Sequence, residues 1–227
     1  MVQNSSKKEN IFITGLAGFI AFHMAEYYLK KGFYVFGVDN FLSGQRENIE
    51  VLKKNYPNQF NFQEVDILNR ENLFKYANER DISLIYHLAC PASPPIYQKD
   101  PLNTLDVCYV GTKNILDLAK AHHARILLAS TSEIYGDPLE HPQPEHYRGN
   151  VNTMGIRSCY DEGKRILETL GFVYAQEGLE VRTARIFNTY GPRQSARAVI
   201  PTIITQIASG IKQIKLGDTT PTRDFNF

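Results

Sequence analysis

Tyr160 and Lys164 are the two residues whose spacing points most directly to chemistry. They lie four positions apart in a stretch with helical periodicity, so both side chains would project from one face of a helix. A free tyrosine has a pKa near 10, but a neighbouring ammonium group stabilises its phenolate. Lowering this pKa by about 3 units takes roughly 4 kcal/mol, which Lys164 and a second nearby cation could supply. The pair predicts a catalytic base for a substrate hydroxyl, although the same spacing also arises by chance on solvated helices.

Hydroxyl and acidic side chains follow a strand-like segment at residues 125–130. Thr131, Ser132 and Glu133 come directly after it. A hydroxyl at the carboxyl end of a strand can hydrogen-bond the oxygen atom that is being oxidised. We therefore expect these three residues to act together with Tyr160, and the competing interpretation is an ordinary Ser/Thr turn.

A glycine-containing turn follows the first strand-like segment. Gly15 and Gly18 are separated by two residues, and Phe19 and Ile20 then begin a helical stretch. Such a turn lets backbone N–H groups approach a pyrophosphate while the helix N-terminus supplies partial positive charge. The spacing is G-x-x-G-x-x-A rather than G-x-G-x-x-G, so a tight turn without a ligand is the alternative.

Asp39 follows the second strand-like segment, 21 residues after Gly18. An acidic residue at this place accepts hydrogen bonds from the adenosine ribose hydroxyls and repels the 2′-phosphate of NADP, so the pattern predicts NAD. Asn40 would share that role, and Asp66 with Ile67 would meet the adenine. Turn capping by Asp39 and an ordinary loop position for Asp66 are the alternatives.

Short apolar segments alternate with longer amphipathic ones along most of the chain. This alternation predicts a parallel sheet that is covered by helices on both faces, a doubly wound α/β fold of the Rossmann type. We expect an NAD-binding domain over residues 1–190 and a small, apparently incomplete C-terminal substrate lobe over residues 191–227. The predicted strands are residues 11–14, 34–38, 61–65, 84–88, 125–130, 180–186 and 213–216. The predicted helices include residues 18–31, 70–79, 101–122, 158–177 and 199–209.

Two proline-rich stretches interrupt the alternation, at residues 91–101 and 138–152. Proline disfavours helix in the residue before it, so both stretches are predicted to be loops. Each follows a predicted strand, and ligands in open α/β sheets lie beyond the carboxyl ends of the strands. Both loops are therefore expected to line a binding site.

Composition excludes several classes of function. The formal net charge of +1 gives no electrostatic case for nucleic acid or a membrane surface as partner. Residues 1–10 are polar and no apolar run approaches the length of a membrane span, which predicts a cytoplasmic protein. The histidines show no ligand spacing, so no metal site is predicted. Cys90, Cys108 and Cys159 are odd in number and far apart, and are interpreted as reduced packing residues.

Long stretches of the sequence resemble a known family. With the Tyr160 and Lys164 pair and the glycine turn in place, the chain resembles the extended short-chain dehydrogenase/reductase family, and within it the branch of UDP-glucuronate decarboxylases. The matching segments are residues 87–95, 97–101, 128–138, 141–144, 149–152, 157–165 and 185–193.

This resemblance implies an NAD-dependent conversion of UDP-glucuronate to UDP-xylose by oxidation at C4, loss of CO₂ and re-reduction. It makes Tyr160 the base, places Lys164 at the nicotinamide ribose and Thr131 at the substrate O4, and assigns the sugar carboxylate or the C5 proton to Glu133 with Ser132. Further cofactor contacts are implied for Leu88, Ala89 and Ala129. Substrate contacts are implied for Pro91, Ser93, Tyr97, Asn188, Thr189 and Arg193, with Asn188 and Arg193 at the nucleotide diphosphate.

Three features leave the reaction open. Asp106 stands where the decarboxylases have a lysine that is expected to face the substrate. Residues 194–205 and 221–224 look more like dehydratases of UDP-N-acetylhexosamines, whereas Ser132 replaces the aspartate that many dehydratases use as an acid. The alternatives are therefore a 4,6-dehydratase or epimerase acting on another UDP-sugar such as UDP-N-acetylglucosamine, or a non-catalytic NAD or nucleotide-sugar binding protein. The resemblance also implies a homodimer packed through residues 101–122 and 158–177.

Overall fold

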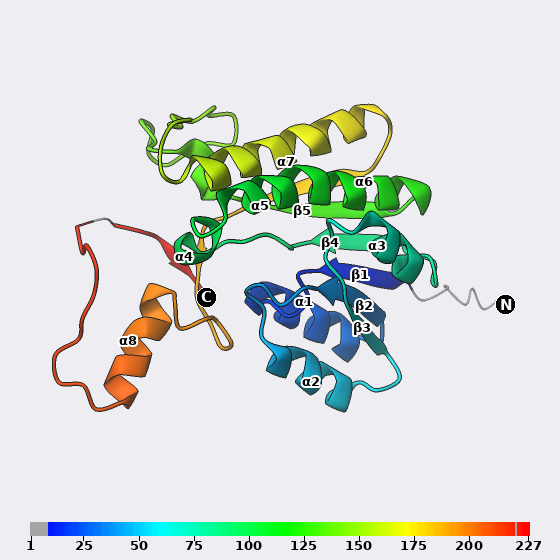
Figure 1. The fold of residues 1–227 in the computed structure, drawn as a ribbon, viewed down its shortest axis with the longest axis horizontal. Coiled ribbons are helices and arrows are strands. Elements are labelled where there is room, and N and C mark those ends of the chain that lie inside the picture. The colour runs from blue at the N-terminus through cyan, green and yellow to red at the C-terminus, as the bar shows by residue number, and fades with distance from the viewer. Residues whose placement is uncertain (1–8, 221) are drawn as a thin grey trace, which may run out of the picture.

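A six-stranded parallel sheet forms the centre of the molecule (Figure 1). The computed structural model describes residues 9–220 and 222–227, so part of the polar stretch at residues 1–10 lies outside the described residues. The strand order is β3-β2-β1-β4-β5-β6. The strands are β1 (Asn10–Thr14), β2 (Tyr34–Asp39), β3 (Phe60–Glu64), β4 (Leu84–His87), β5 (Arg125–Thr131) and β6 (Val181–Ile186). The predicted doubly wound α/β fold is confirmed.

Helices cover both faces of the sheet. The helical segments are α1 (Phe19–Lys30), α2 (Arg46–Asn55), α3 (Arg70–Ala77), α4 (Pro94–Tyr97), α5 (Pro101–Asp106), the π-helix η1 (Val107–Gly111), α6 (Thr112–Ala121), the 3₁₀ turn η2 (Ser132–Tyr135), α7 (Ser158–Gln176) and α8 (Val199–Ala208). Alternate residues of β1 belong to two different hydrophobic cores, one on each face of the sheet, because strand side chains point to opposite faces. Phe12 packs with α3, α6 and α7, whereas Ile11 and Ile13 pack with α1 and α2.

The observed elements differ from the predicted ones in several places. The proline-rich stretch at residues 91–101 contains the short helix α4, because proline is compatible with the first turn of a helix. Helix α2 was not predicted. The predicted helix over residues 101–122 is divided by the π-helix η1. Residues 213–216 were predicted to form a strand, but they are exposed and have no strand partner among the described residues.

The C-terminal segment returns to the end of the sheet through a second, very short pairing. Strand β7 (Asn188–Thr189) pairs in parallel with β8 (Phe225–Asn226). Helix α8 lies between these two strands in sequence, and none of its residues is buried. No helix within the described part of the chain has the length and apolarity needed to cross a membrane.

Candidate active site

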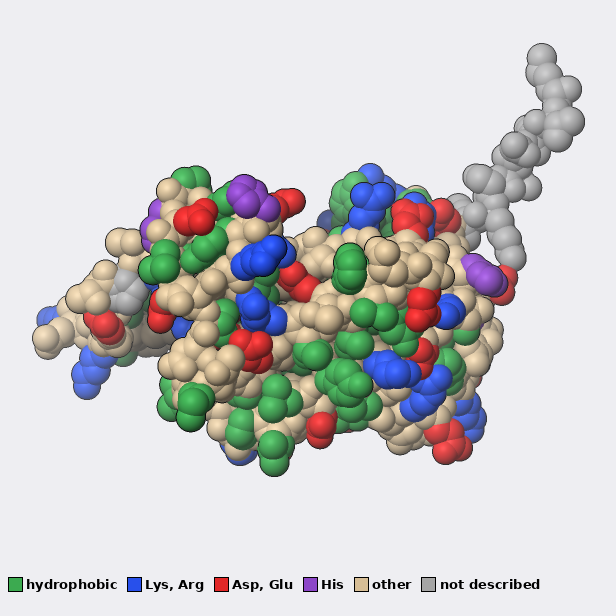
Figure 2. All heavy atoms as spheres, turned by 90° about the horizontal axis from the view of Figure 1, so that it is seen from above, with side chains coloured by type: hydrophobic (Ala, Val, Ile, Leu, Met, Phe, Trp, Pro, Cys, Tyr) green, Lys and Arg blue, Asp and Glu red, His purple; other side chains and the backbone are tan. Residues whose placement is uncertain are grey.

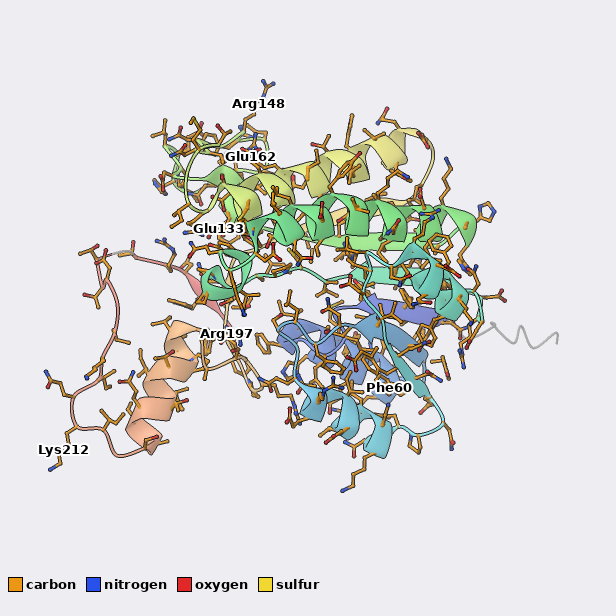
Figure 3. The ribbon with its side chains drawn as sticks, in the orientation of Figure 1. Phe60, Glu133, Arg148, Glu162, Arg197 and Lys212 are labelled. Carbon is orange, nitrogen blue, oxygen red and sulfur yellow. The ribbon has the colours of Figure 1, made fainter. Side chains whose placement is uncertain are left out.

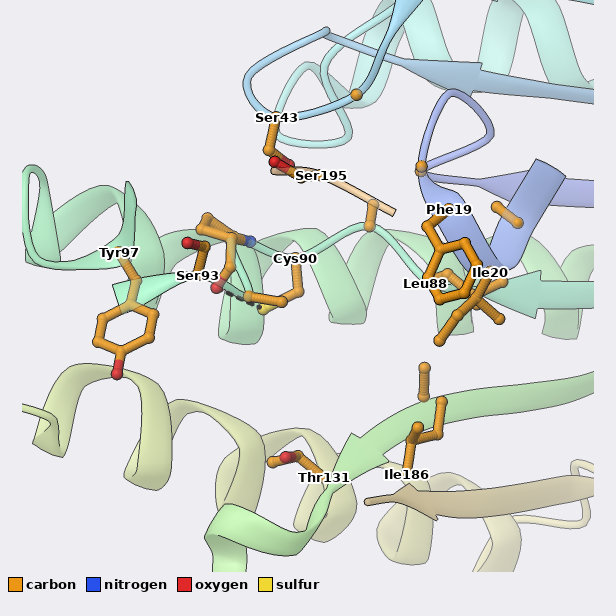
Figure 4. A pocket seen from close by; sticks show the side chains of 18 of the residues that line it. Phe19, Ile20, Ser43, Leu88, Cys90, Ser93, Tyr97, Thr131, Ile186 and Ser195 are labelled. Atoms are coloured by element: carbon orange, nitrogen blue, oxygen red, sulfur yellow. Dashed lines mark hydrogen bonds between the residues drawn. The ribbon is translucent and has the colours of Figure 1, made fainter. Parts of the chain in front are cut away.

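A cleft of about 590 Å³ lies beyond the carboxyl ends of the strands. Its volume falls in the range of small-molecule and cofactor sites. Every residue to which the sequence assigned a binding or catalytic role lines this cleft, while the individual roles stay predictions. Figure 4 shows one wall formed by Cys90, Ser93 and Tyr97 after β4, with Thr131 and Ile186 facing it and Phe19, Ile20 and Leu88 at one end.

The glycine turn brings the backbone of two strand ends together. Gly15 has a φ of 70°, and a Cβ atom there would lie 2.8 Å from the Ala89 nitrogen. Gly18 begins α1 without a side-chain cap, so the first turn of the helix keeps N–H donors for a ligand. Phe22 is buried in the core and does not line the cleft, so its ring is compatible with a bound cofactor.

Asp39 is held at the end of β2 by two backbone donors. Its Oδ2 accepts a hydrogen bond from the Ala17 N–H at 3.0 Å and its Oδ1 accepts one from the Phe41 N–H at 2.7 Å. Burial raises the pKa of Asp39, while these N–H groups lower it. The carboxylate therefore stabilises a local turn, as the capping interpretation proposed, and also faces the cleft where a ribose would lie.

Asn40 and Asp66 form the next contact along this edge. The Asn40 Nδ2 donates to Asp66 Oδ2 at 2.9 Å, and Asp66 Oδ1 accepts from the Leu68 N–H at 2.8 Å. The side chains that were expected near the adenosine thus hold one another in place across the ends of β2 and β3.

The helix α7 brings Tyr160 and Lys164 to the end of β5. Lys164 is buried, and its Nζ donates a hydrogen bond to the Ala129 carbonyl at 2.8 Å. The same Nζ lies 5.9 Å from the centre of the Tyr160 ring. Tyr160 is itself buried, and a hydrogen bond with the Thr131 hydroxyl favours its ionised form. Residues from β5 and α7 therefore surround one phenol group, as the sequence predicted.

The pKa of Tyr160 differs from the expected one. Burial raises this pKa to about 12, and the lowering effects of Lys164 and Thr131 only partly offset the burial. Burial also removes charge screening, so an additional cation placed beside the ring would lower the pKa strongly. A cation bound in the cleft beside the ring would therefore favour the phenolate form of Tyr160.

A second tyrosine supports the first. The Tyr97 ring stacks on the Tyr160 ring, with centroids 4.9 Å apart and an angle of 6° between the planes. The Tyr97 hydroxyl is buried and makes no well-aligned hydrogen bond with the described residues. The hydroxyl lies beside the Arg157 guanidinium, and the Arg157 charge partly offsets the rise in the Tyr97 pKa that burial causes.

Glu133 forms an ion pair with Arg157, a residue that the sequence reasoning missed. Arg157 precedes α7 and lines the cleft, and its Nε has no well-aligned partner among the described residues. Asp161 lies next to this pair, and burial raises its pKa to about 6. The charge of Glu133 is thus balanced by Arg157, and the Arg157 guanidinium also lies beside the Tyr97 hydroxyl.

Three arginines line the opposite side of the cleft. Arg193 was predicted, whereas Arg197 and Arg223 were missed. The Arg193 Nη1 donates to Asn48 Oδ1 at 3.0 Å, and its guanidinium lies 4.1 Å from the Phe22 ring centre. Glu133 reaches the cleft from η2 and Arg197 from the segment before α8 (Figure 3). Guanidinium groups bind phosphate oxygens well, so this side of the cleft suits a diphosphate.

His87 ends β4 and is held in the core by two threonine side chains. Its Nδ1 is 2.8 Å from the Thr14 hydroxyl and its Nε2 is 3.1 Å from the Thr112 hydroxyl. Burial, with a smaller effect of the Lys164 charge, lowers the pKa of His87 to about 3, so the ring is neutral. No group of three or more potential metal ligands occurs within residues 9–220 and 222–227.

Asp106 does not occupy the position that the resemblance implied for it. It is the last residue of α5, it is exposed, and it is absent from the cleft lining, whereas the following Val107 does line the cleft. The Asp106 carboxylate therefore does not face the cleft, unlike the lysine that is expected at this position in the decarboxylases.

The sequence profile of the GDP-mannose 4,6 dehydratase family matches residues 12–227. The chain therefore belongs to this family of extended short-chain dehydrogenases/reductases. UDP-glucuronic acid decarboxylase 1 of Xenopus tropicalis is 44% identical over 223 residues, which are 97% of this chain and 51% of the relative. The chain spans about half the length of the first curated relatives it matches.

Solved structures agree with this assignment of the fold. The UDP-glucose 4-epimerase of Thermotoga maritima, solved with UDP-glucose, superposes with a TM-score of 0.83 at 27% identity and covers 95% of this chain and 68% of its own. The dTDP-glucose 4,6-dehydratase of Bacillus anthracis, solved with NAD, has a TM-score of 0.81 at 26% identity and covers 96% and 67%.

Proposed function

We propose that this chain binds NAD and carries the catalytic groups of an enzyme that converts UDP-glucuronate to UDP-xylose and CO₂. The observation that carries the proposal is the position of Tyr160, Thr131 and Lys164 in the same cleft as the glycine turn and Asp39. The similarity to UDP-glucuronic acid decarboxylases supports the choice of substrate.

The residues of the glycine turn fit a dinucleotide. Because Gly15 and Gly18 have no side chains, the pyrophosphate could approach the backbone N–H groups at the start of α1. The Asp39 carboxylate would accept hydrogen bonds from the ribose hydroxyls. NAD held by these residues would supply the hydride acceptor for oxidation at C4 of the sugar and the hydride donor for the later re-reduction. We assign cofactor binding to residues 1–190 and part of the sugar-nucleotide contacts to residues 191–227.

The proton chemistry belongs to Tyr160. Its phenolate would accept the proton of the C4 hydroxyl while the Thr131 hydroxyl holds that oxygen. Lys164, fixed by the Ala129 carbonyl, keeps a positive charge beside the phenolate. A ketone at C4 lies β to the C5 carboxylate, so loss of CO₂ leaves a carbanion that is delocalised as an enolate and takes up a proton at C5. The net reaction consumes one proton and releases CO₂.

We assign recognition of the sugar carboxylate to the region of Glu133 and Arg157. Arg157 lies beside Tyr97, its Nε has no well-aligned partner among the described residues, and Glu133 holds the guanidinium in place. Glu133 and Ser132 would then have different roles. The ion-paired Glu133 would orient Arg157, and the Ser132 hydroxyl would lie nearer to the sugar. The arginines after β6 would bind the diphosphate.

The test is incubation of the chain with UDP-glucuronate and NAD⁺, followed by analysis of CO₂ and UDP-xylose. We expect both products from the wild type and neither from the Tyr160→Phe variant. A charge-matched comparison of Arg157→Gln with Arg148→Gln examines carboxylate recognition, because Arg148 is exposed and does not line the cleft. Only the first of these two variants should raise the KM for UDP-glucuronate.

Other outcomes would contradict the proposal in distinct ways. Turnover of UDP-N-acetylglucosamine without turnover of UDP-glucuronate would favour a dehydratase or epimerase. Binding of NAD without turnover of any sugar would favour a binding protein.

We also propose that two copies of the chain associate through the outer face of α5, η1 and α7. Figure 2 looks onto the side that carries α7, where hydrophobic side chains lie among the charged ones. Leu102 is 74% exposed, Phe172 is 65% exposed, and Tyr109 and Val173 are also exposed. Light scattering should give a dimer for the wild type and a monomer for Phe172→Asp, while Leu139→Asp, in the loop after η2, should remain dimeric. A monomeric wild type would contradict this proposal.

The three cysteines of the chain are free thiols. Free thiols are usual in reducing compartments, so we propose a cytoplasmic location. Fractionation of the source cells would test it, and recovery of the protein from a secretory compartment would contradict it.

A further inference from the structure

Two sulfur atoms meet at the wall of the cleft. Cys90 follows β4 and lines the cleft (Figure 4), and Cys108 lies buried in the π-helix η1. Their Sγ atoms are 3.5 Å apart, although the residues are 18 positions apart in the sequence. The sequence reasoning treated these cysteines as separate packing residues, and the structure brings two of the three into contact.

Three segments of the chain create this contact. The wide turn of the π-helix places Cys108 on the side of η1 that faces the end of β4. Gly163 in α7 leaves the space for it, because a Cβ atom at Gly163 would lie 3.0 Å from the Cys108 Sγ. π-Helical turns occur frequently at functional sites. The approach of the two sulfurs is therefore built into the packing of η1 against α7.

The two thiols are chemically different. The hydrogen bond with Cys108 lowers the pKa of the Cys90 thiol, and the nearby Lys164 ammonium lowers it further, so that the pKa lies below the ordinary thiol value despite burial. The same contact with Cys90, together with burial, raises the pKa of Cys108. A thiolate is the reactive form of cysteine, so Cys90 is the nucleophile and Cys108 is placed to react in a second step.

We propose that Cys90 and Cys108 form a reversible dithiol–disulfide pair that is oxidised by hydroperoxides. In the first step the Cys90 sulfur attacks a peroxide oxygen, the O–O bond breaks, and Cys90 becomes a sulfenic acid while the departing hydroxide takes a proton to form water. In the second step the Cys108 sulfur loses its proton, attacks the Cys90 sulfur and displaces hydroxide, which forms a second water.

The two steps conserve electrons, and the distance between the two sulfurs is short enough for the bond to form. The two thiols together lose two electrons, which reduce one hydrogen peroxide to two waters, and a dithiol reductant restores both thiols. An S–S bond of about 2.05 Å requires the sulfurs to approach by about 1.5 Å, a shift that side-chain rotation within the cleft wall can supply.

If Tyr160 is the base of the proposed function, formation of the disulfide would also affect catalysis. In the reduced form the Cys90 sulfur receives a hydrogen bond from Lys164. A disulfide sulfur cannot carry the negative charge that balances this ammonium group. Oxidation would therefore change the charge around the Tyr160 base without altering any group that contacts the substrate oxygen.

Peptide mapping tests the disulfide without reference to activity. The reduced chain is treated with a small excess of hydrogen peroxide, remaining thiols are alkylated, and tryptic peptides are analysed by mass spectrometry. Trypsin separates the three cysteines, which fall in residues 81–99, 100–113 and 158–164. We expect the first two peptides to be cross-linked, the third to be alkylated, and the cross-link to disappear after treatment with dithiothreitol.

Variants and alternative products complete the test. The cross-link should persist in Cys159→Ser and be absent in Cys90→Ser. If Cys108→Ser does not fold, the peptide map of the oxidised wild type still tests the proposal. A disulfide between Cys90 and Cys159 would overturn the proposal. Accumulation of sulfinic acid at Cys90 with an alkylated Cys108 would overturn it as well, because it would show that Cys108 does not react with the intermediate.

Discussion

The Tyr160 ring lies in a parallel stack on the Tyr97 ring, with 4.9 Å between the centroids. Tyr97 belongs to the short helix α4 after β4, whereas Tyr160 belongs to α7. Such aromatic pairs contribute about 0.5–1.5 kcal/mol beyond the burial of their surfaces. The proline-rich stretch after β4 thus fixes the plane of the phenol to which we assign the role of base.

Two substitutions at Tyr97 separate the ring from its hydroxyl. Tyr97→Phe should leave the melting temperature unchanged or slightly higher, because the hydroxyl is buried without a well-aligned partner, while the KM for the sugar nucleotide rises. Tyr97→Leu should destabilise the chain by about 1 kcal/mol or more and lower kcat, because the stack is lost. Thermal unfolding and steady-state kinetics provide the comparison. Equal losses of kcat in both variants would show that the stack does not position Tyr160.

The pH profile of turnover should follow the ionisation of Tyr160. Burial raises the pKa of Tyr160 to about 12, the Lys164 charge and the Thr131 hydroxyl lower it, and the nearby Cys90 and Cys108 raise it. The active phenolate therefore becomes more abundant as the pH rises, so kcat/KM should increase between about pH 6 and 9. A flat profile over this range would contradict the assignment of Tyr160 as the base.

Lys164→Met should make the rise of kcat/KM with pH occur at higher pH. Loss of the ammonium group raises the pKa of Tyr160 further, so kcat/KM should fall by about 10²-fold or more at neutral pH and recover partly at alkaline pH. The same measurement on Lys113→Met, an exposed lysine of α6 outside the cleft, serves as the control. Loss of activity that is independent of pH in Lys164→Met would indicate a role in binding alone.

Asp161 should make the stability of the chain depend on pH. Burial raises its folded-state pKa to about 6, while the Arg157 charge lowers it and Glu133, Glu162 and Asp137 raise it. An acid with a raised pKa in the folded state stabilises the fold below its unfolded pKa of 3.8 and loses that contribution as the pH rises through about 6. Relative to Asp161→Asn, the wild type should therefore lose stability across this window.

Thermal unfolding at a series of pH values measures this difference. Glu50→Gln is a control for the loss of one carboxylate, because Glu50 is exposed on α2 and is not among the groups that shift the Asp161 pKa. A constant difference between wild type and Asp161→Asn from pH 3.8 to about 6 would show that Asp161 ionises normally.

Asp39 should determine the choice between NAD and NADP. Asp39→Ser removes the charge that would repel a 2′-phosphate, so the ratio of the two Kd values should shift towards NADP by about tenfold or more. The variant should also be less stable by about 1–3 kcal/mol, because the Ala17 and Phe41 N–H groups lose their acceptor. Fluorescence titrations with both cofactors measure the ratio, and Glu50→Gln on α2 is the exposed control. An unchanged ratio would contradict the role of Asp39.

Much of the fold and the cleft follows from local sequence patterns. The strands are short, apolar and bounded by turn residues, so the six strands of the main sheet lie within one or two residues of their predicted bounds. The parallel arrangement then determines that residues following each strand, such as Thr131 and Asp39, reach the same edge. This is why all the residues predicted for the site line one cleft.

The remaining features depend on contacts that a local pattern does not contain. The π-helix η1 alters the rotation of side chains between α5 and α6, so the contact between Cys90 and Cys108 could not be derived from helical spacing. Arg223 reaches the cleft through pairing of β7 with β8. Arg157 was missed because it lies before α7 rather than in the Tyr160 and Lys164 motif.

The pairing of β7 with β8 also has a dynamic consequence. Two residue pairs close a loop of more than thirty residues that carries Arg193, Arg197 and Arg223, whereas the other side of the cleft is built on segments that follow strands of the six-stranded sheet. Short ladders with little buried surface open locally at a much lower free energy than the whole domain unfolds. We therefore expect the segment that carries the three arginines to open more readily than the six-stranded sheet, so amide hydrogen exchange should be faster at Tyr190 than at Ile126.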